Sequence, residues 1–268
     1  MFKGWFCLCL FSMRMISATI VESMTIQDIE KYRTQGTLII YDLDNTLIEP
    51  VQLLGSDQWF YYRLGQMVEK YNDREKALRK TLVEWVAAQA VTKVKVVEEG
   101  TAELIRLQQA EGTMIMGLTT RDGLMAHCTL DQLDELAIDL RKTAPRTEPL
   151  IFHSERPIFF DGGVLFTSGT HKGKAFLKFL ELVDYQPKRV LFINDKYSNI
   201  KEVAHVCYET GIEFLGLRYG YLDEKIAQFN ADIAEIQSFN FGNILSDEKA
   251  YEIFLEGLLT KESGTSLD

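Results

Sequence analysis

The chain is predicted to adopt an α/β fold with a doubly wound, mainly parallel sheet. Short runs of apolar, β-prone residues alternate along the chain with longer segments whose apolar residues recur at helical spacing. The runs at 37–41, 113–118 and 188–193 each contain a continuous apolar stretch, which is typical of strands that are buried on both faces of a parallel sheet. Strands that alternate with helices in this way indicate a Rossmann-like arrangement, with helices on both faces of the sheet.

The remaining elements follow from the same periodicity. Further helices are expected at 24–36, 97–110, 130–140, 172–183, 199–208 and through most of 222–259, and a further strand is expected at 212–217. Residues 158–167 predict a β-hairpin that turns at Asp161-Gly162-Gly163, because paired turn residues between two apolar runs favour tight reversal. Residues 48–95 are rich in aromatic residues and mostly helical in pattern, so they interrupt the alternation directly after the first strand.

Composition excludes several classes of protein. Of the 268 residues, 46% are apolar and 25% are charged, which is ordinary for a globular domain and too polar for a protein with many membrane spans. The formal net charge of −10 argues against nucleic acid as the main partner, because phosphate backbones select basic surfaces. The four histidines show no spacing typical of a zinc site, and Cys128 and Cys207 are expected to be buried thiols without a disulfide.

The N-terminus resembles a secretory signal peptide. A basic residue, Lys3, precedes a short apolar run, and small residues follow near Ala18, which is the order found in exported proteins. The apolar run is too short to form a stable membrane span. A periplasmic or secreted protein that begins near Thr19 is therefore expected. A start-site extension or a buried N-terminal helix of a cytoplasmic protein remains the alternative.

Two aspartates, Asp42 and Asp44, directly follow the apolar strand at 37–41. Ligand sites in open α/β sheets lie just beyond the carboxyl ends of the strands, and Asp195 follows another such strand at 188–193. Like charges ~4 Å apart repel by ~4 kcal/mol at an effective dielectric constant of 20, so neighbouring carboxylates at this edge need a cation between them. Oxygen ligands of modest number favour Mg²⁺, which also accepts a substrate phosphate oxygen.

The sequence Asp42-Leu-Asp44-Asn-Thr46 after an apolar strand resembles motif I of the haloacid dehalogenase (HAD) superfamily. Three further matches follow in the order of that superfamily. They are Thr119 at the end of the second strand, Lys172 at the start of a helix, and Asn194-Asp195 with Asn199 four residues later. One departure is Asn194, because that position is often Asp or Gly in the superfamily.

The resemblance implies a role for each matched residue. Asp42 would attack phosphorus and form an aspartyl-phosphate, and Asp44 would protonate the leaving group and then activate water. Thr119 and Lys172 would bind the phosphoryl oxygens. Thr120 and Arg121 are implied as substrate contacts. The implied Mg²⁺ ligands are Asp42, Asp44 through its backbone carbonyl, Asp195 and Asn199.

The resemblance also implies an organisation and an activity. By this resemblance residues 19–47 and 96–260 would be the HAD-like core and 48–95 a small helical cap. The residues at the two ends predict a signal peptide at 1–18 and a flexible tail at 261–268. The implied activity is Mg²⁺-dependent hydrolysis of a small phosphorylated substrate in a bacterial protein. A phosphomutase and a secreted, non-catalytic binding or effector protein on the same scaffold are the alternatives, and the oligomeric state is left open.

Overall fold

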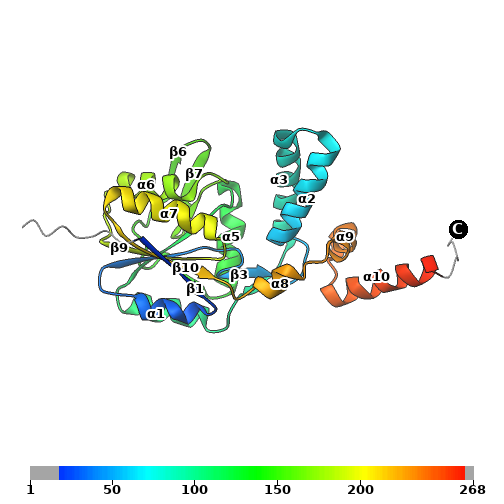
Figure 1. Ribbon diagram of the computed structural model, residues 1–268, viewed down its shortest axis with the longest axis horizontal. Helices are drawn as coiled ribbons and strands as arrows, with labels where there is room; N and C mark the ends of the chain where they lie inside the picture. The colour runs from blue at the N-terminus through cyan, green and yellow to red at the C-terminus, as the bar shows by residue number, and fades with distance from the viewer. Residues whose placement is uncertain (1–17, 263–268) are drawn as a thin grey trace, which may run out of the picture.

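The computed structural model describes residues 18–262 and confirms the predicted fold class, a mainly parallel α/β sheet (Figure 1). The described sheet has eight strands in the order β1-β10-β9-β2-β5-β8-β7-β6. The first six pair in parallel, whereas β7 pairs antiparallel with both β8 and β6. In chain order the strands are β1 Ala18–Ser23, β2 Thr37–Tyr41, β5 Met114–Thr119, β6 Leu150–His153, β7 Pro157–Asp161, β8 Val164–Phe166, β9 Arg189–Asn194 and β10 Glu213–Tyr219.

The central strand β2 shows why both faces of the sheet are covered. All five of its residues are buried, and successive side chains point to opposite faces. Leu38 and Ile40 pack into the cluster beneath α6 (Lys172–Leu182) and α7 (Tyr197–Thr210). Ile39 and Tyr41 pack into the cluster on the other face. The helices that contribute to this second cluster are η1 Ile26–Asp28, α1 Ile29–Tyr32, α4 Thr101–Ala110 and α5 Ala126–Glu135, with η2 Gly123–Met125 before α5.

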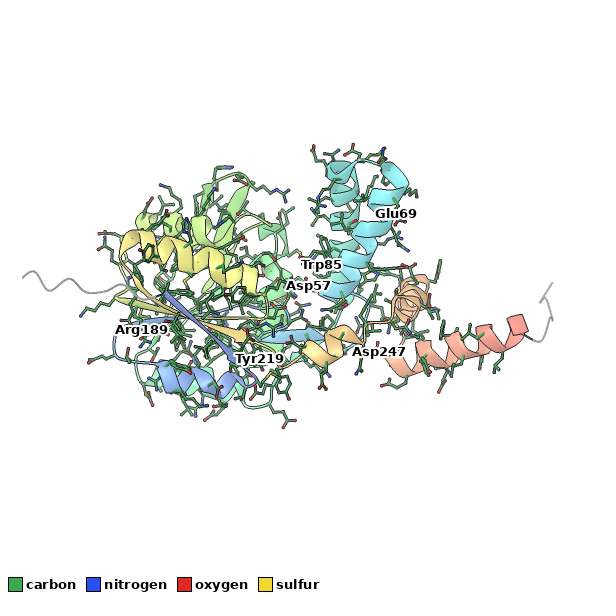
Figure 2. The ribbon with its side chains drawn as sticks, viewed as in Figure 1. Asp57, Glu69, Trp85, Arg189, Tyr219 and Asp247 are labelled. Atoms are coloured by element: carbon green, nitrogen blue, oxygen red, sulfur yellow. The ribbon has the colours of Figure 1, made fainter. Side chains whose placement is uncertain are left out.

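Residues 48–96 form a helical hairpin on a short antiparallel ribbon. The ribbon pairs β3 (Ile48–Pro50) with β4 (Val94–Val96), and the hairpin consists of α2 (Asp57–Tyr71) and α3 (Arg74–Val91). Figure 1 shows both helices standing away from the sheet beyond the carboxyl ends of its strands. The rings of Trp59 and Trp85 stack 6.3 Å apart at the foot of this hairpin, as Figure 2 shows for Trp85.

The C-terminal helices pack against the foot of the hairpin. They are α8 Asp223–Ala227, α9 Ala231–Phe239, η3 Phe241–Asn243 and α10 Asp247–Glu262. Ala234 of α9 is fully buried in one cluster with Trp59 and Trp85, whereas most of α10 projects away from the body (Figure 1). In the part of the chain that the structure describes, no helix combines the length and the apolar character needed to cross a bilayer.

Several details differ from the sequence prediction. Strand β1 was not predicted; it begins at Ala18, the last residue of the predicted leader, and pairs with β10. Strand β6 adds a third strand to the predicted hairpin, whose turn between Asp161 and Val164 is confirmed. Helix α5 ends at Glu135, before the predicted 140. The predicted signal peptide, apart from its last residue, and the last six residues of the predicted tail lie outside the described residues.

Candidate active site

The candidate site lies at the carboxyl edge of three neighbouring strands. Strand β2 is paired on one side with β9 and on the other with β5. Because the three strands are parallel, the residues at their ends meet at one edge of the sheet. This topology gathers Asp42 after β2, Thr119 at the end of β5 and Asp195 after β9, although they are far apart in the sequence.

Asp42 and Lys172 form a buried ion pair. The Lys172 Nζ lies 2.7 Å from the Asp42 Oδ1, and both side chains are less than a tenth exposed. Burial raises the pKa of Asp42, while the charge and the hydrogen bond of Lys172 act in the opposite direction. The same Oδ1 accepts a bond from the Leu43 backbone N–H. Two donors thus hold one carboxylate oxygen of Asp42, which fixes the direction of the other.

Asp44 is held by the guanidinium of Arg121. The two residues form a bidentate pair, with Nε to Oδ2 at 3.0 Å and Nη2 to Oδ1 at 2.7 Å. Burial would raise the pKa of Asp44, but Arg121 outweighs that effect and holds the pKa below its ordinary value. The rest of the Arg121 guanidinium donates to Thr129, Gln132 and Gln89. The predicted substrate contact of Arg121 therefore competes with bonds that orient Asp44.

Asp195 has one carboxylate oxygen without a protein partner. Its Oδ2 accepts a bond of 3.3 Å from the side-chain amide of Asn45, whereas its Oδ1 is buried and accepts no hydrogen bond from any residue that the structure describes. Burial and then the nearby Asp42 raise the pKa of Asp195 to about 7. Leaving a buried carboxylate oxygen unsatisfied costs stability, and a cation at this oxygen would remove that cost.

The geometry is compatible with the Mg²⁺ site that the resemblance implies. Within residues 18–262, no three His, Cys, Asp or Glu side chains form a group that could hold a metal ion. Asp44 directs its carboxylate to Arg121, and the predicted ligand Asn199 directs its side-chain amide to Asn194. Of the predicted donors, the carboxylates of Asp42 and Asp195 and the backbone carbonyl of Asp44 remain. Oxygen donors of this kind suit Mg²⁺, which keeps several water ligands. The unpartnered Asp195 Oδ1 is the observation that favours a cation here.

The other predicted residues occupy supporting positions. The buried hydroxyl of Thr119 accepts a hydrogen bond from the backbone N–H of Arg121 and keeps its own proton free to donate to another acceptor. Thr120 is exposed, next to it. The Asn199 side chain lies 3.5 Å from the Oδ1 of Asn194, which also accepts the Lys196 N–H. Asn194, the last residue of β9, and Asn199, in the first turn of α7, thus bond to each other across the loop that carries Asp195.

Lys196 connects this loop to the helical hairpin and was not predicted as a site residue. Its ammonium pairs with the carboxylate of Asp57, the first residue of α2, and lies 5.0 Å from the centre of the Tyr61 ring. Burial lowers the pKa of Lys196, but Asp57 and Asp195 outweigh burial and raise it. Figure 2 shows Asp57 at the end of the hairpin that faces the sheet. Lys196 lies between Asp195 and Asn199 in the sequence, and this position is the signal that could have identified it as a site residue.

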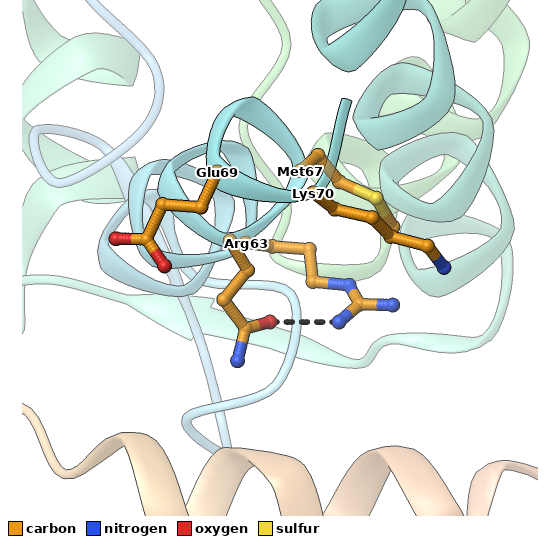
Figure 3. A pocket seen from close by; sticks show the side chains of 5 residues that line it. Arg63, Met67, Glu69 and Lys70 are labelled. Carbon is orange, nitrogen blue, oxygen red and sulfur yellow. Dashed lines mark hydrogen bonds between the residues drawn. The ribbon is translucent and has the colours of Figure 1, made fainter. Parts of the chain in front are cut away.

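A hollow that is separate from the candidate site lies along α2. It has a volume of about 400 Å³ and is lined by one helix face that includes Arg63, Met67 and Lys70 (Figure 3). Arg63 donates to Gln66 and is paired with Glu84. None of the predicted site residues lines this hollow.

Comparison with known proteins gives a family and distant relatives. The model of the family described as "Protein of unknown function (DUF2608)" matches residues 18–251. A Chlamydia trachomatis protein provisionally named as an outer membrane protein is 26% identical over 238 residues, covering 87% of this chain and 89% of that protein. A Chlamydia pneumoniae protein with the same kind of name is 24% identical over 219 residues, covering 82% of each chain.

The similar solved structures are HAD-superfamily hydrolases and related enzymes. One of them, a HAD-superfamily hydrolase of Geobacter sulfurreducens, has a TM-score of 0.39 and 14% identity to this chain. That match covers 71% of this chain and 95% of the hydrolase.

Proposed function

Because the chain belongs to the DUF2608 family, whose description names no activity, we propose a function from the site itself, namely Mg²⁺-dependent hydrolysis of a small phosphorylated substrate. The observation that carries this proposal is the buried Asp42 at the end of β2, held by Lys172 at 2.7 Å. One of its carboxylate oxygens is held by two donors, so the other is positioned to react. The unpartnered oxygen of Asp195 supports a cation beside it.

The proposed reaction has two steps with balanced atoms and charges. In the first step, an Asp42 oxygen bonds to phosphorus, the bond from phosphorus to the ester oxygen breaks, and Asp44 gives a proton to the departing alcohol. In the second step, water attacks the aspartyl-phosphate, its proton passes to Asp44, and Asp42 is released with inorganic phosphate. Arg121 favours the ionised form of Asp44, which is the form that accepts the proton from water in the second step. The first step therefore starts from the minor, protonated form of Asp44, and the proton taken from water restores that form.

The remaining residues bind and orient the phosphoryl group. The Lys172 ammonium and the Thr119 hydroxyl can each donate to phosphoryl oxygens, because each retains a donor beyond the bond described above. Mg²⁺ held by Asp42, Asp195 and the Asp44 carbonyl would neutralise charge on the phosphoryl oxygens.

The test compares the wild-type protein with Asp42→Asn on p-nitrophenyl phosphate, with and without Mg²⁺. We expect turnover to require Mg²⁺ and to fall by about 10⁴-fold in Asp42→Asn, because the amide keeps the shape of the side chain but is not a nucleophile. Asp131→Asn is the matched control, because Asp131 is 59% exposed and lies on the surface of α5. Equal activity in Asp42→Asn and the wild type would contradict the proposal.

We also propose that the protein works outside the cytoplasm. The leader-like residues 1–18 support this, and so do the names of the chlamydial relatives. Intact-mass measurement on periplasmic and cytosolic fractions of a bacterial host tests the proposal. We expect a periplasmic form that begins near Thr19, whereas a full-length form found only in the cytosol would contradict export without affecting the proposed chemistry.

A further inference from the structure

A cavity of about 630 Å³ lies between the helical hairpin and the loops that follow β5 and β8. Its volume is in the range of sites that take small molecules. One wall comes from α2 and α3 and is formed by apolar side chains, among them Phe60, Leu64, Leu78, Leu82, Val83 and Val86. The opposite wall adds Leu124 and Met125 from the segment after β5.

The cavity begins where the proposed reaction would release its alcohol. Asp44, the proposed proton donor to that alcohol, is part of the cavity lining. Asp42 and Lys172, which would hold the phosphoryl group, are not among the described residues that line it. A substrate with its phosphorus at Asp42 would therefore direct its leaving group past Asp44 into this cavity.

Apolar side chains that line the cavity are open to solvent. Val83 is 69% exposed and Leu124 is 89% exposed, and they lie on opposite walls. Single exposed apolar residues are common on protein surfaces, but a group of them lining one concave site is typical of a binding surface. An apolar ligand would cover both walls and release the water that now contacts them.

Several polar groups of the cavity already bond to other groups of the protein, which reduces the number that a ligand with many hydroxyl groups could use. The Asp57 carboxylate is paired with Lys196, and an Asp122 oxygen accepts the Leu124 N–H. Arg156 donates to the backbone carbonyl of Ser168. A site that selects a polyol needs converging donors and acceptors, which would be left unpaired by an apolar ligand. The charged side chains of the lining are three arginines and three aspartates, so their charges balance and the apolar side chains are left to select the ligand.

We propose that this cavity binds the leaving group and that the substrates are phosphate monoesters of bulky apolar alcohols. The proposal rests on the phosphohydrolase function proposed above. It adds that selectivity comes from the hairpin and from the segment after β5, and not from the residues that hold the phosphoryl group.

The substrate test uses two esters of primary alcohols that are similar in size and reactivity. Cyclohexylmethyl phosphate and glucose 6-phosphate each carry one six-membered ring, and they differ mainly in their hydroxyl groups. We expect kcat/KM to be at least about 10-fold higher for cyclohexylmethyl phosphate, since differences of this size follow from modest apolar contacts. Equal values, or a preference for the sugar ester, would overturn the proposal.

A pair of double variants tests the cavity itself. Val83→Gln with Leu124→Gln places one polar side chain on each wall without adding charge. We expect kcat/KM for cyclohexylmethyl phosphate to fall about 10-fold, while turnover of acetyl phosphate, whose leaving group is small and polar, stays within about twofold. The control combines Val91→Gln with Leu107→Gln, because these residues are 50% and 46% exposed and lie outside the cavity lining.

The outcomes separate this inference from the proposed function. If the wild-type protein turns over acetyl phosphate in an Asp42-dependent way but the two double variants behave alike on both substrates, the cavity assignment is wrong and the phosphohydrolase proposal stands. If no phosphate ester is turned over in an Asp42-dependent way, the phosphohydrolase proposal fails, and the substrate class fails with it.

Discussion

At the scale of single residues, each buried charge of the site has a different partner. Asp42 pairs with Lys172 and Asp44 pairs with Arg121. Asp195 accepts its hydrogen bond from a neutral amide, that of Asn45, while the charges of Lys196 and Lys172 act to lower its pKa. Breaking a buried ion pair is costly because the remaining charge is left unpaired. Among the described residues Asp195 forms no direct ion pair, so without a metal it is the carboxylate of the three at which function and stability oppose each other.

Asp195→Asn is expected to stabilise the metal-free protein by about 1 kcal/mol at pH 8, because an amide is cheaper to bury than a carboxylate. The carboxyl ionises near 3.8 when unfolded and near 7 when folded. Between these values the folded state binds more protons, so the wild-type protein loses stability as pH rises. The gain in the variant should therefore be largest above pH 7 and vanish near pH 4.

Thermal unfolding in EDTA and in Mg²⁺ measures both effects. Mg²⁺ should raise the Tm of the wild-type protein and leave that of Asp195→Asn unchanged, because ligands stabilise only the state that binds them. The exposed Asp131→Asn variant serves as the control and should respond as the wild type does. A variant that keeps the full Mg²⁺ response would show that Asp195 is not a ligand.

At the scale of elements, the position of Lys172 depends on how closely α6 approaches α7. Gly173 follows Lys172, and a Cβ at Gly173 would lie 2.1 Å from the backbone oxygen of Glu202 in α7. The Glu202 carboxylate in turn accepts the backbone N–H of Lys172 at 2.6 Å. Glycine thus permits a helix contact that fixes the first turn of α6 against α7.

Gly173→Ala is expected to destabilise the protein by about 2 kcal/mol, because α6 must move away from α7. It should also reduce phosphatase activity, since the movement carries Lys172 away from Asp42. Gly65→Ala is the matched control, because Gly65 lies in α2 and a Cβ there would meet no atom within 4 Å. That change should stabilise the helix by up to about 1 kcal/mol. Urea unfolding of both variants measures the two changes in the free energy of unfolding, which should have opposite signs. Equal changes would contradict the proposed close contact at Gly173.

The central elements were predicted well from the sequence, because elements that are buried consist mostly of apolar residues. Strand β2 is apolar at nearly every position, and Gly211 ends α7 in the left-handed conformation expected of a helix terminus. Strand β1 was missed because its edge position leaves most of its residues partly or fully exposed. Its pattern therefore lacks the continuous apolar run by which β2 was recognised.

At the scale of the whole molecule, the C-terminal helices complete the foot of the hairpin. The buried Gln237 side chain of α9 accepts the Leu54 N–H and donates to Asp247. Asp247 also accepts the Leu53 N–H at 2.8 Å, and Figure 2 shows it at the start of α10. These contacts join residues about 190 positions apart in the chain. The sequence does not predict these contacts, because the residue types glutamine and aspartate do not indicate which distant groups they will bond.

The same limit explains what the sequence missed in the site. Motif positions placed Asp42, Thr119, Lys172 and Asp195 at the ends of neighbouring strands or beside them. The partner of Arg121 could not be predicted, because Asp44 lies 77 residues away and a charged side chain can pair with any opposite charge within reach. Periodicity predicts which face is buried, whereas pairing among buried charges depends on the finished packing.

The attachment of α9 and α10 to the foot of the hairpin also determines when the protein can finish folding. A chain is made from its N-terminus, but β2 lacks its neighbour β9 and the Trp59–Trp85 cluster lacks Ala234 until late in synthesis. Contacts between residues so distant in sequence form slowly, because a long loop must close before each contact is made. The sheet and the hairpin therefore stay open until the segments that carry β9 and Ala234 have been made and have joined them.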